Sequence, residues 1–188
     1  GARPHLGVNA IDAAAAAVNA VNAIHLNPTE TYSVKATRFL SDSGVTNAIP
    51  HTAVVTWDLR AQRNTTMESL RAKFRPAVEA AAATVGATVT IDDAEIIPAA
   101  ELNEEATSFL REAIVKVLGE ENLIDPIYTP GGEDFFFYTT EKPHLKAGFF
   151  GLGCDLKPGL HHPEMHFSVE ALDHGVNIWV ALTEKFLA

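Results

Sequence analysis

The sequence predicts an α+β chain in two parts: a two-layer, ferredoxin-like sandwich that lacks its first strand, followed by the last strands and helices of an α/β domain. Three observations predict this class. Some segments repeat apolar residues at helical spacing, shorter ones alternate apolar with polar residues, and the proline-containing stretch 97–100 separates the two parts. With 188 residues, 47% of them hydrophobic, the chain can bury a substantial core.

The first part, residues 1–98, is expected to run as helix, strand, strand, helix and strand. Asn9 can cap the first helix, and Thr65 with Glu68 forms a capping box for the second, in which Pro76 is expected to cause a kink. Alternating residues predict the strands, which cover 32–37, 52–60 and 87–91. A doubled split strand–helix–strand motif has this order once its first strand is removed, and a two-layer sandwich is the natural way to bury it.

The second part, residues 99–188, is expected to alternate helices and strands. Asn103 can cap a helix that Gly119 ends, and Ser168 is expected to cap the last helix of the chain. Two short apolar segments, residues 123–128 and 147–152, have the character of core strands.

Charge and cysteine content exclude several classes of partner. The chain carries 14 Lys and Arg against 24 Asp and Glu, a formal charge of −10, which repels nucleic acid and anionic lipid. Its longest run of small residues, 13–18, is followed at once by Asn19, so no membrane span is expected. A single cysteine, Cys154, and the lack of a recognisable leader favour a cytoplasmic location.

Two adjacent histidines are the first candidates for chemistry. Residues 151–167 read GLGCDLKPGLHHPEMHF, which places His161 and His162 in a turn rich in Pro and Gly. Imidazole is the commonest protein ligand for zinc, and a loop on a rigid scaffold can hold such a ligand open to substrate. The alternative is that both are ordinary polar turn residues, because a His-His pair alone lacks the spacing of a specific zinc motif. Cys154 can join them, although a lone cysteine is more typically a small buried residue.

Two further pairs carry charged or amide groups. Glu133 and Asp134 follow two glycines and precede three phenylalanines, so they can serve a metal ion or a proton transfer, or simply cap the next turn. Asn47 in a loop and Arg60 on a strand suit the binding of a carboxylate, whereas Arg60 alone is typical of a solvated residue or a partner of Asp58.

Four stretches in order resemble the zinc aminoacylase/carboxypeptidase family, which includes hippurate hydrolases, auxin-conjugate hydrolases and bacterial N-acyl-amino-acid amidohydrolases. They are GARPHLGVNAIDAA, TNAIP followed by DLRAQ, GGEDFFFY and LHHPEMHF. The resemblance runs nearly from end to end. It implies that residues 1–98 are a lid and dimerisation domain and that residues 99–188 are the C-terminal part of a catalytic domain.

The resemblance also implies an activity and roles for particular residues. In this family two metal ions, zinc or else manganese or cobalt, activate water to hydrolyse the amide bond of an N-acyl amino acid or small peptide. By motif, His161 matches a metal ligand of the family. Asn47 and Arg60 match the pair that binds the substrate carboxylate. Three further positions in the same motifs match the lining of the pocket. These lining positions are Gly132, Glu133 and His162. The resemblance further implies a homodimer formed through the lid.

The catalytic groups of the family have no counterpart in these residues. The general-base glutamate, the oxyanion histidine and most metal ligands belong to stretches that this sequence does not contain, and His5 does not match the oxyanion histidine. We therefore expect the chain to be an incomplete portion of an amidohydrolase, binding metal weakly and hydrolysing nothing alone. The alternative is a non-catalytic module for dimerisation or the binding of a small ligand.

Overall fold

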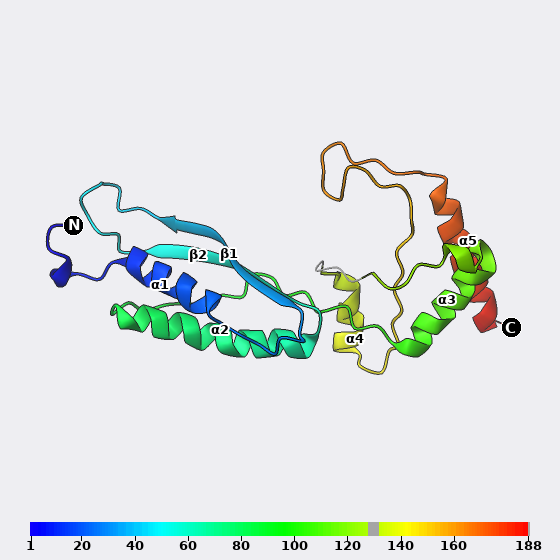
Figure 1. Cartoon of the computed structure of the whole chain (residues 1–188), viewed down its shortest axis with the longest axis horizontal. Coiled ribbons are helices and arrows are strands. Elements are labelled where there is room, and N and C mark those ends of the chain that lie inside the picture. The colour runs from blue at the N-terminus through cyan, green and yellow to red at the C-terminus, as the bar shows by residue number, and fades with distance from the viewer. Residues whose placement is uncertain (128–131, 188) are drawn as a thin grey trace. The chain divides into compact units, whose positions relative to one another are not determined.

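The computed structural model describes residues 1–127 and 132–187. They form two compact units. Unit 1 contains residues 1–100 with the described part of 130–134, and unit 2 contains the described parts of 101–129 and 135–188. Each combines helices with extended backbone, and the paired strands belong to unit 1 (Figure 1). The predicted α+β class is thereby confirmed.

Unit 1 packs two helices against an antiparallel two-stranded sheet (Figure 1). Its elements, after a 3-10 turn at Pro4–Leu6, are α1 (Ala10–Asn22), β1 (Tyr32–Ser41), β2 (Ala53–Ala61) and α2 (Asn64–Thr84). The register pairs Val34 with Leu59 and shifts once, between Ala36 and Arg38. Val21 and Leu70 are completely buried, and the ring of Trp57 meets that of Phe74 edge to face at 5.4 Å. The side chains that form the apolar pattern in the sequence therefore face one shared core.

The strand expected over residues 87–91 does not form. Ile91 still packs against the core of unit 1, so the alternation correctly indicates one inward side chain. A strand, however, also needs a paired backbone, and no described residue bonds to the backbone of residues 88–91. Periodicity in the sequence predicts that Ile91 faces the core, but it contains no information on whether a neighbouring strand is present.

Unit 2 is built around two long helices. Its elements are α3 (Glu104–Leu118), a 3-10 turn at Glu120–Asn122, a second at Asp134–Phe136 that begins in unit 1, α4 (Phe137–Glu141) and α5 (Ala171–Leu187). Ala113 of α3 packs with Ile178 and Ala181 of α5. Two ion pairs link the exposed sides of the same helices, Lys116 with Glu184 and Lys185 with Glu112.

The apolar segment 147–152 lies against both helices but is not a strand. A Cβ added to Gly148 would come within 3.0 Å of the Ala106 carbonyl oxygen on α3, and one at Gly175 of α5 would lie 3.1 Å from Leu152. The expectation of a core strand here is wrong for the described residues, because the backbone of the segment has no adjacent strand. Of residues 123–128, the described part is also not a strand, and residue 128 lies outside the described residues.

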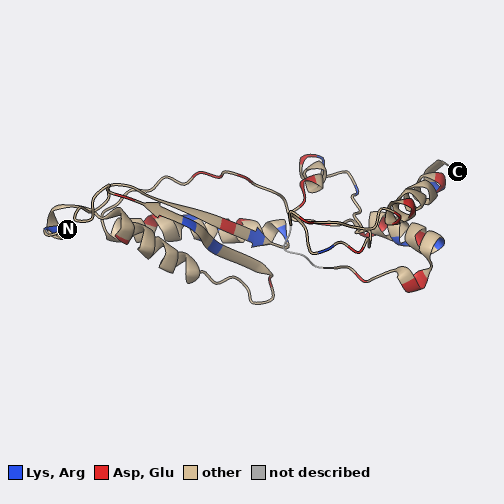
Figure 2. Cartoon of the chain, turned by 90° about the horizontal axis from the view of Figure 1, so that it is seen from above, with Lys and Arg blue, Asp and Glu red and all other residues tan. Residues whose placement is uncertain are grey.

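Charged side chains are distributed over both units. Figure 2 shows Asp and Glu together with Lys and Arg along the helices of each unit, and no helix there carries basic side chains alone. In the part of the chain that the structure describes, no helix has the length and apolar character to span a bilayer.

Candidate functional site

His161 lies at the turn of a hairpin-like loop in unit 2. Lys157 and His166 close the loop through two backbone hydrogen bonds, Lys157 N–H to His166 O at 2.9 Å and His166 N–H to Lys157 O at 2.8 Å. A third bond runs from the Ser168 N–H to the Cys154 carbonyl oxygen at 2.8 Å. Three hydrogen bonds at two residue pairs therefore hold the two arms together, and His161 is placed between them.

The backbone of His161 adopts a left-handed conformation. Its φ is +64°, and Asp155 is the other non-glycine residue with positive φ among the described residues. This conformation is costly for a residue with a Cβ, and such outliers are concentrated at functional sites. The His161 imidazole is exposed and makes no hydrogen bond to any residue that the structure describes. It is thus presented to solvent with both ring nitrogens available.

His162 and His166 turn toward their own loop. The Nδ1 atom of His162 accepts a hydrogen bond from the Glu164 N–H at 3.1 Å, and the Nδ1 atom of His166 lies 3.1 Å from the Glu164 carbonyl oxygen. His162 thus has its Nδ1 engaged while the neighbouring His161 does not. Sequence reasoning missed the closing role of His166, which comes from its backbone and which no side-chain pattern in the sequence signals.

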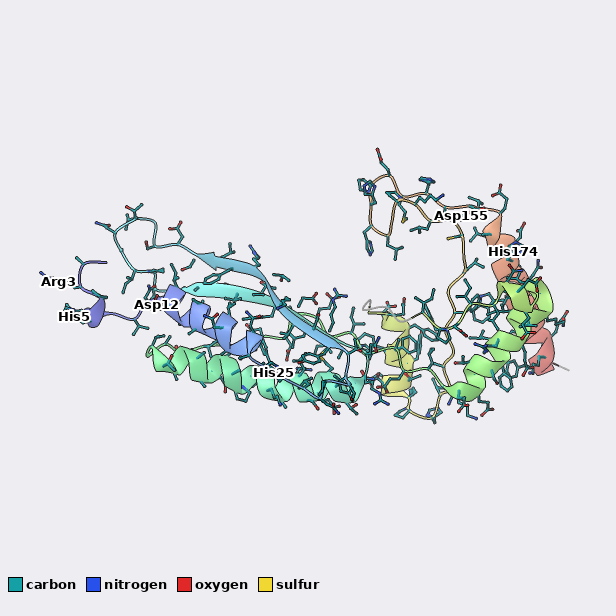
Figure 3. The ribbon with its side chains drawn as sticks, viewed as in Figure 1. Arg3, His5, Asp12, His25, Asp155 and His174 are labelled. Atoms are coloured by element: carbon teal, nitrogen blue, oxygen red, sulfur yellow. The ribbon has the colours of Figure 1, made fainter. Side chains whose placement is uncertain are left out.

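Cys154 and Asp155 stand on the arm that leads into the loop. Cys154 is half-buried, and its carbonyl oxygen accepts the bond from Ser168. Figure 3 shows Asp155 on this arm and His174 in the first turn of α5. Among the described residues, no group of three or more His, Cys, Asp or Glu side chains surrounds a point where a metal ion could bind. The residues present therefore do not fit a complete zinc site.

Asn47 lies at the end of unit 1 where β2 begins. It belongs to the loop 42–52, and its carbonyl oxygen accepts a hydrogen bond from the backbone nitrogen of Gly1 at 2.6 Å. Further along, the Ala10 N–H donates to the Pro50 carbonyl oxygen at 3.2 Å. The first ten residues thus run beside this loop, in the region where Figure 3 shows Arg3 and His5. The Asn47 side chain is exposed.

Arg60 lies near the opposite end of β2. Its Nε donates to Asp58 Oδ2 at 2.8 Å, so one carboxylate on the same face of the strand orients the guanidinium. Both side chains are 45% exposed, and the pair therefore contributes little to stability. Because Ala53 and Arg60 are seven residues apart, β2 alone separates them by about 23 Å. The structure does not bring Asn47 and Arg60 together within one chain.

Gly132 lies at the same end of unit 1 as Arg60. A Cβ added to Gly132 would come within 3.0 Å of Ile97 Cγ2, so the backbone approaches residue 97 closely. Two residues after Ile97, the Ala99 N–H donates to Asn64 Oδ1 at 2.9 Å, at the start of α2 and just after β2 ends. Glu133 adjoins Gly132 and is half-buried. Three predicted site positions, Arg60, Gly132 and Glu133, are therefore grouped at this end.

Comparison with known proteins identifies the family. The model of peptidase family M20/M25/M40 matches residues 1–185. A p-aminobenzoyl-glutamate hydrolase homolog of Haemophilus influenzae is 25% identical over 198 residues, covering 100% of this chain and 45% of that protein. A Rhodococcus jostii protein named as a glutamate--cysteine ligase 2-3 is 28% identical over 186 residues, covering 97% of this chain and 23% of that protein.

Solved structures share the fold. A Bacillus subtilis protein described as a dinuclear metal binding peptidase of the M20 family has a TM-score of 0.75 at 24% identity, covering 93% of this chain and 45% of that one. The aminopeptidase PepT of Bacillus cereus has a TM-score of 0.77 at 20% identity, covering 99% and 48%. The chain thus spans about half of these structures and less than half of the curated relatives. Together with the motifs, the match over residues 1–185 shows that this chain belongs to peptidase family M20/M25/M40.

Proposed function

We propose that this chain is the lid and C-terminal catalytic portion of a metal-dependent amidohydrolase that cleaves the amide bond of N-acyl amino acids or small peptides. In this proposal residues 1–98 are the lid and residues 99–188 complete the catalytic domain. The proposal places the working protein in the cytoplasm, in agreement with the single, half-buried Cys154. Family membership supports hydrolysis, and the name of a relative that acts on p-aminobenzoyl-glutamate supports an N-acylated amino acid as substrate.

The observation that carries the proposal is the conformation of His161. A left-handed histidine at the turn of a loop fixed by three backbone hydrogen bonds presents its imidazole outward at the cost of backbone strain. This is the geometry expected of a ligand that must meet further ligands from elsewhere. A polar turn residue without such a role would be replaced by Gly or Asn at lower cost.

A metal ion would supply a polarised carbonyl and an activated water when the site is complete. Within this chain His161 would hold the ion, and His162, whose Nδ1 is already bonded, would stand beside it. Among the described residues, no three His, Cys, Asp or Glu side chains lie close enough together to hold a metal ion, so the remaining ligands would come from outside this chain. Imidazole ligands suit zinc and also manganese or cobalt, and two ions per complete site are proposed.

Substrate binding would rest on unit 1. The Arg60 guanidinium, oriented by Asp58, suits bidentate binding of a carboxylate, with Gly132 and Glu133 lining the same end. Asn47 precedes the other end of β2, and the strand from Ala53 to Arg60 alone spans about 23 Å. Both residues can therefore act on one small substrate only if they come from two copies of the chain. This separation supports the proposed homodimer.

The incomplete site gives a direct test. We expect the purified 188-residue chain with zinc and hippurate to show no turnover, whereas the longer polypeptide that supplies the remaining ligands hydrolyses hippurate or another N-acyl amino acid. Enzyme-like turnover by the 188-residue chain would refute the proposal that this chain lacks part of the active site. An inactive longer polypeptide that nevertheless dimerises would instead favour a non-catalytic binding module.

Mixed dimers test the shared substrate site. In the longer polypeptide, Asn47→Ala and Arg60→Ala should each reduce kcat/KM by about one hundredfold, as expected for loss of a carboxylate contact of about 3 kcal/mol. Mixing the two variants should restore part of the activity, because a mixed dimer contains one site with both native residues. A mixture that stays as inactive as its components would place both residues in one chain's site.

A further inference from the structure

The sheet of unit 1 has one covered face and one open face. Val34 and Leu59 lie opposite each other in the register and pack into the core with residues of α1 and α2. Because neighbouring residues of a strand point to opposite faces, Lys35, Asp58 and Arg60 point away from that core. Lys35 and Arg60 are exposed. The open face therefore presents charged side chains at the end of β2 where Arg60 lies.

Positive charge predominates on this part of the open face. The register places Lys35 opposite Asp58, and it places Arg38 opposite Thr56, the next position of β2 on the same face. Together with Arg60, these residues carry three positive charges and one negative charge, in a chain whose formal charge is −10. Figure 2 shows blue and red positions together on the two strands. A local surplus of cations attracts a ligand with more than one negative charge.

Lys35 lies across the sheet from a carboxylate but does not pair with it. The Asp58 carboxylate accepts instead from Arg60 Nε at 2.8 Å, although opposite charges directly across an antiparallel pair ordinarily interact. Lys35 Nζ donates to Asn22 Oδ1, a neutral amide at the end of α1, at 3.3 Å. Lys35 forms no ion pair with any residue that the structure describes. Its positive charge thus stands beside Arg60 without a carboxylate of its own.

Lys35 and Arg60 are close enough to hold two carboxylates of one small molecule. Lys35 is opposite Asp58, which is two residues from Arg60, so Lys35 and Arg60 are diagonal neighbours on the open face. Such neighbours are about 7–8 Å apart at the backbone, within reach of long side chains. The flexible stem of lysine lets its ammonium exchange the neutral Asn22 amide for a carboxylate, which makes a stronger, charge-assisted hydrogen bond.

We propose that Lys35 is a specificity-determining residue, which binds the side-chain carboxylate of an N-acylated aspartate or glutamate whose α-carboxylate is bound by Arg60. This inference rests on the proposed function, because it takes Arg60 as the residue that binds the α-carboxylate. A substrate with a neutral side chain leaves Lys35 with its Asn22 partner and gains nothing from the surplus charge. The open face of the sheet thereby selects acidic amino acids over neutral ones of the same shape.

Two isosteric substrates provide the test. N-benzoyl-glutamate and N-benzoyl-glutamine have nearly the same shape and differ in the charge of the side chain. In the longer polypeptide, kcat/KM for the glutamate compound should exceed that for the glutamine compound about tenfold, as expected for one hydrogen bond between charged groups. Equal values, or a preference for glutamine, would overturn the role of Lys35 and leave the proposed amidohydrolase intact. No turnover of these compounds or of hippurate would refute both proposals.

Three variants assign the preference to Lys35. Lys35→Gln should lower the ratio of the two kcat/KM values to near one, whereas Lys35→Arg, which keeps the charge, should retain most of the preference. Arg75→Gln is the matched control, because Arg75 is an exposed cation on α2, and it should leave both the ratio and the activity unchanged. The ratio compares two substrates on one protein, so it does not depend on how much of a variant folds. A preference that survives Lys35→Gln would overturn the assignment.

Discussion

At the scale of single residues, His161 allows its structural and functional roles to be separated. Glycine relieves the strain of a positive φ, so His161→Gly should raise the free energy of unfolding by about 1 kcal/mol or leave it unchanged. In the complete protein the same change should remove one metal ligand and lower the bound metal measured by atomic absorption. His166→Gln is the matched control, because its backbone rather than its ring closes the loop. Unchanged metal content in His161→Gly would remove the basis of the proposed site.

Glu170, just before α5, gives a prediction for acid pH. Its own backbone N–H and the Ser168 hydroxyl donate hydrogen bonds to the carboxylate and hold its pKa below the ordinary value of 4.5. A lowered folded-state pKa adds stability above the unfolded-state pKa, and this stability is lost as pH falls through the folded-state pKa. Ser168→Ala should therefore raise the pKa of Glu170, which NMR titration of its carboxyl carbon can measure. An unchanged pKa would assign the shift to the backbone alone.

At the scale of elements, each unit contains one of the two tryptophans, which makes the cores separately measurable. Leu70 is fully buried in unit 1 and Ile178 nearly so in unit 2. Leu70→Ala and Ile178→Ala should each cost about 2–5 kcal/mol through lost burial and a residual cavity. Fluorescence of Trp57 in a Trp179→Phe background reports unit 1, and Trp179 in a Trp57→Phe background reports unit 2. Leu187→Ala, at an exposed position, should be nearly neutral.

Helix caps show where sequence reasoning about elements works and where it fails. Asn9 and Asn103 cap α1 and α3 as predicted, each accepting a backbone N–H at 3.1 Å. The capping box of Thr65 and Glu68 was wrong, since α2 begins at Asn64 and Arg63 occupies the cap position without a side-chain bond. Ser168 likewise bonds to Glu170 and not to the first turn of α5. The capping residue can be predicted from the sequence when a single short polar residue precedes the helix. The prediction is ambiguous when several such residues lie close together.

At the scale of the whole molecule, the predicted elements were recovered better than the predicted pairing. Side-chain periodicity is local, so β1, β2 and the four longest helical segments could be found from the sequence. Residues 87–91 and 147–152 have no neighbouring strand among the described residues, and whether a segment has such a neighbour is not a local property, so periodicity contains no information about it. The candidate site follows the same pattern: motifs indicated Asn47, Arg60 and His161 as candidates, but the separation of the first two by the length of β2 required coordinates.

The exposed apolar face of α5 affects how the isolated chain behaves in solution. Val176, Trp179, Val180 and Phe186 are each about half exposed or more, although they repeat at helical spacing. At a net charge of −10, mutual repulsion opposes non-specific association between copies in dilute buffer. Added salt shortens the range of that repulsion and strengthens burial of apolar surface. Turbidity should therefore appear at a lower ammonium sulfate concentration for this chain than for a Trp179→Lys variant. The difference between the two concentrations measures how strongly the apolar face of α5 drives association.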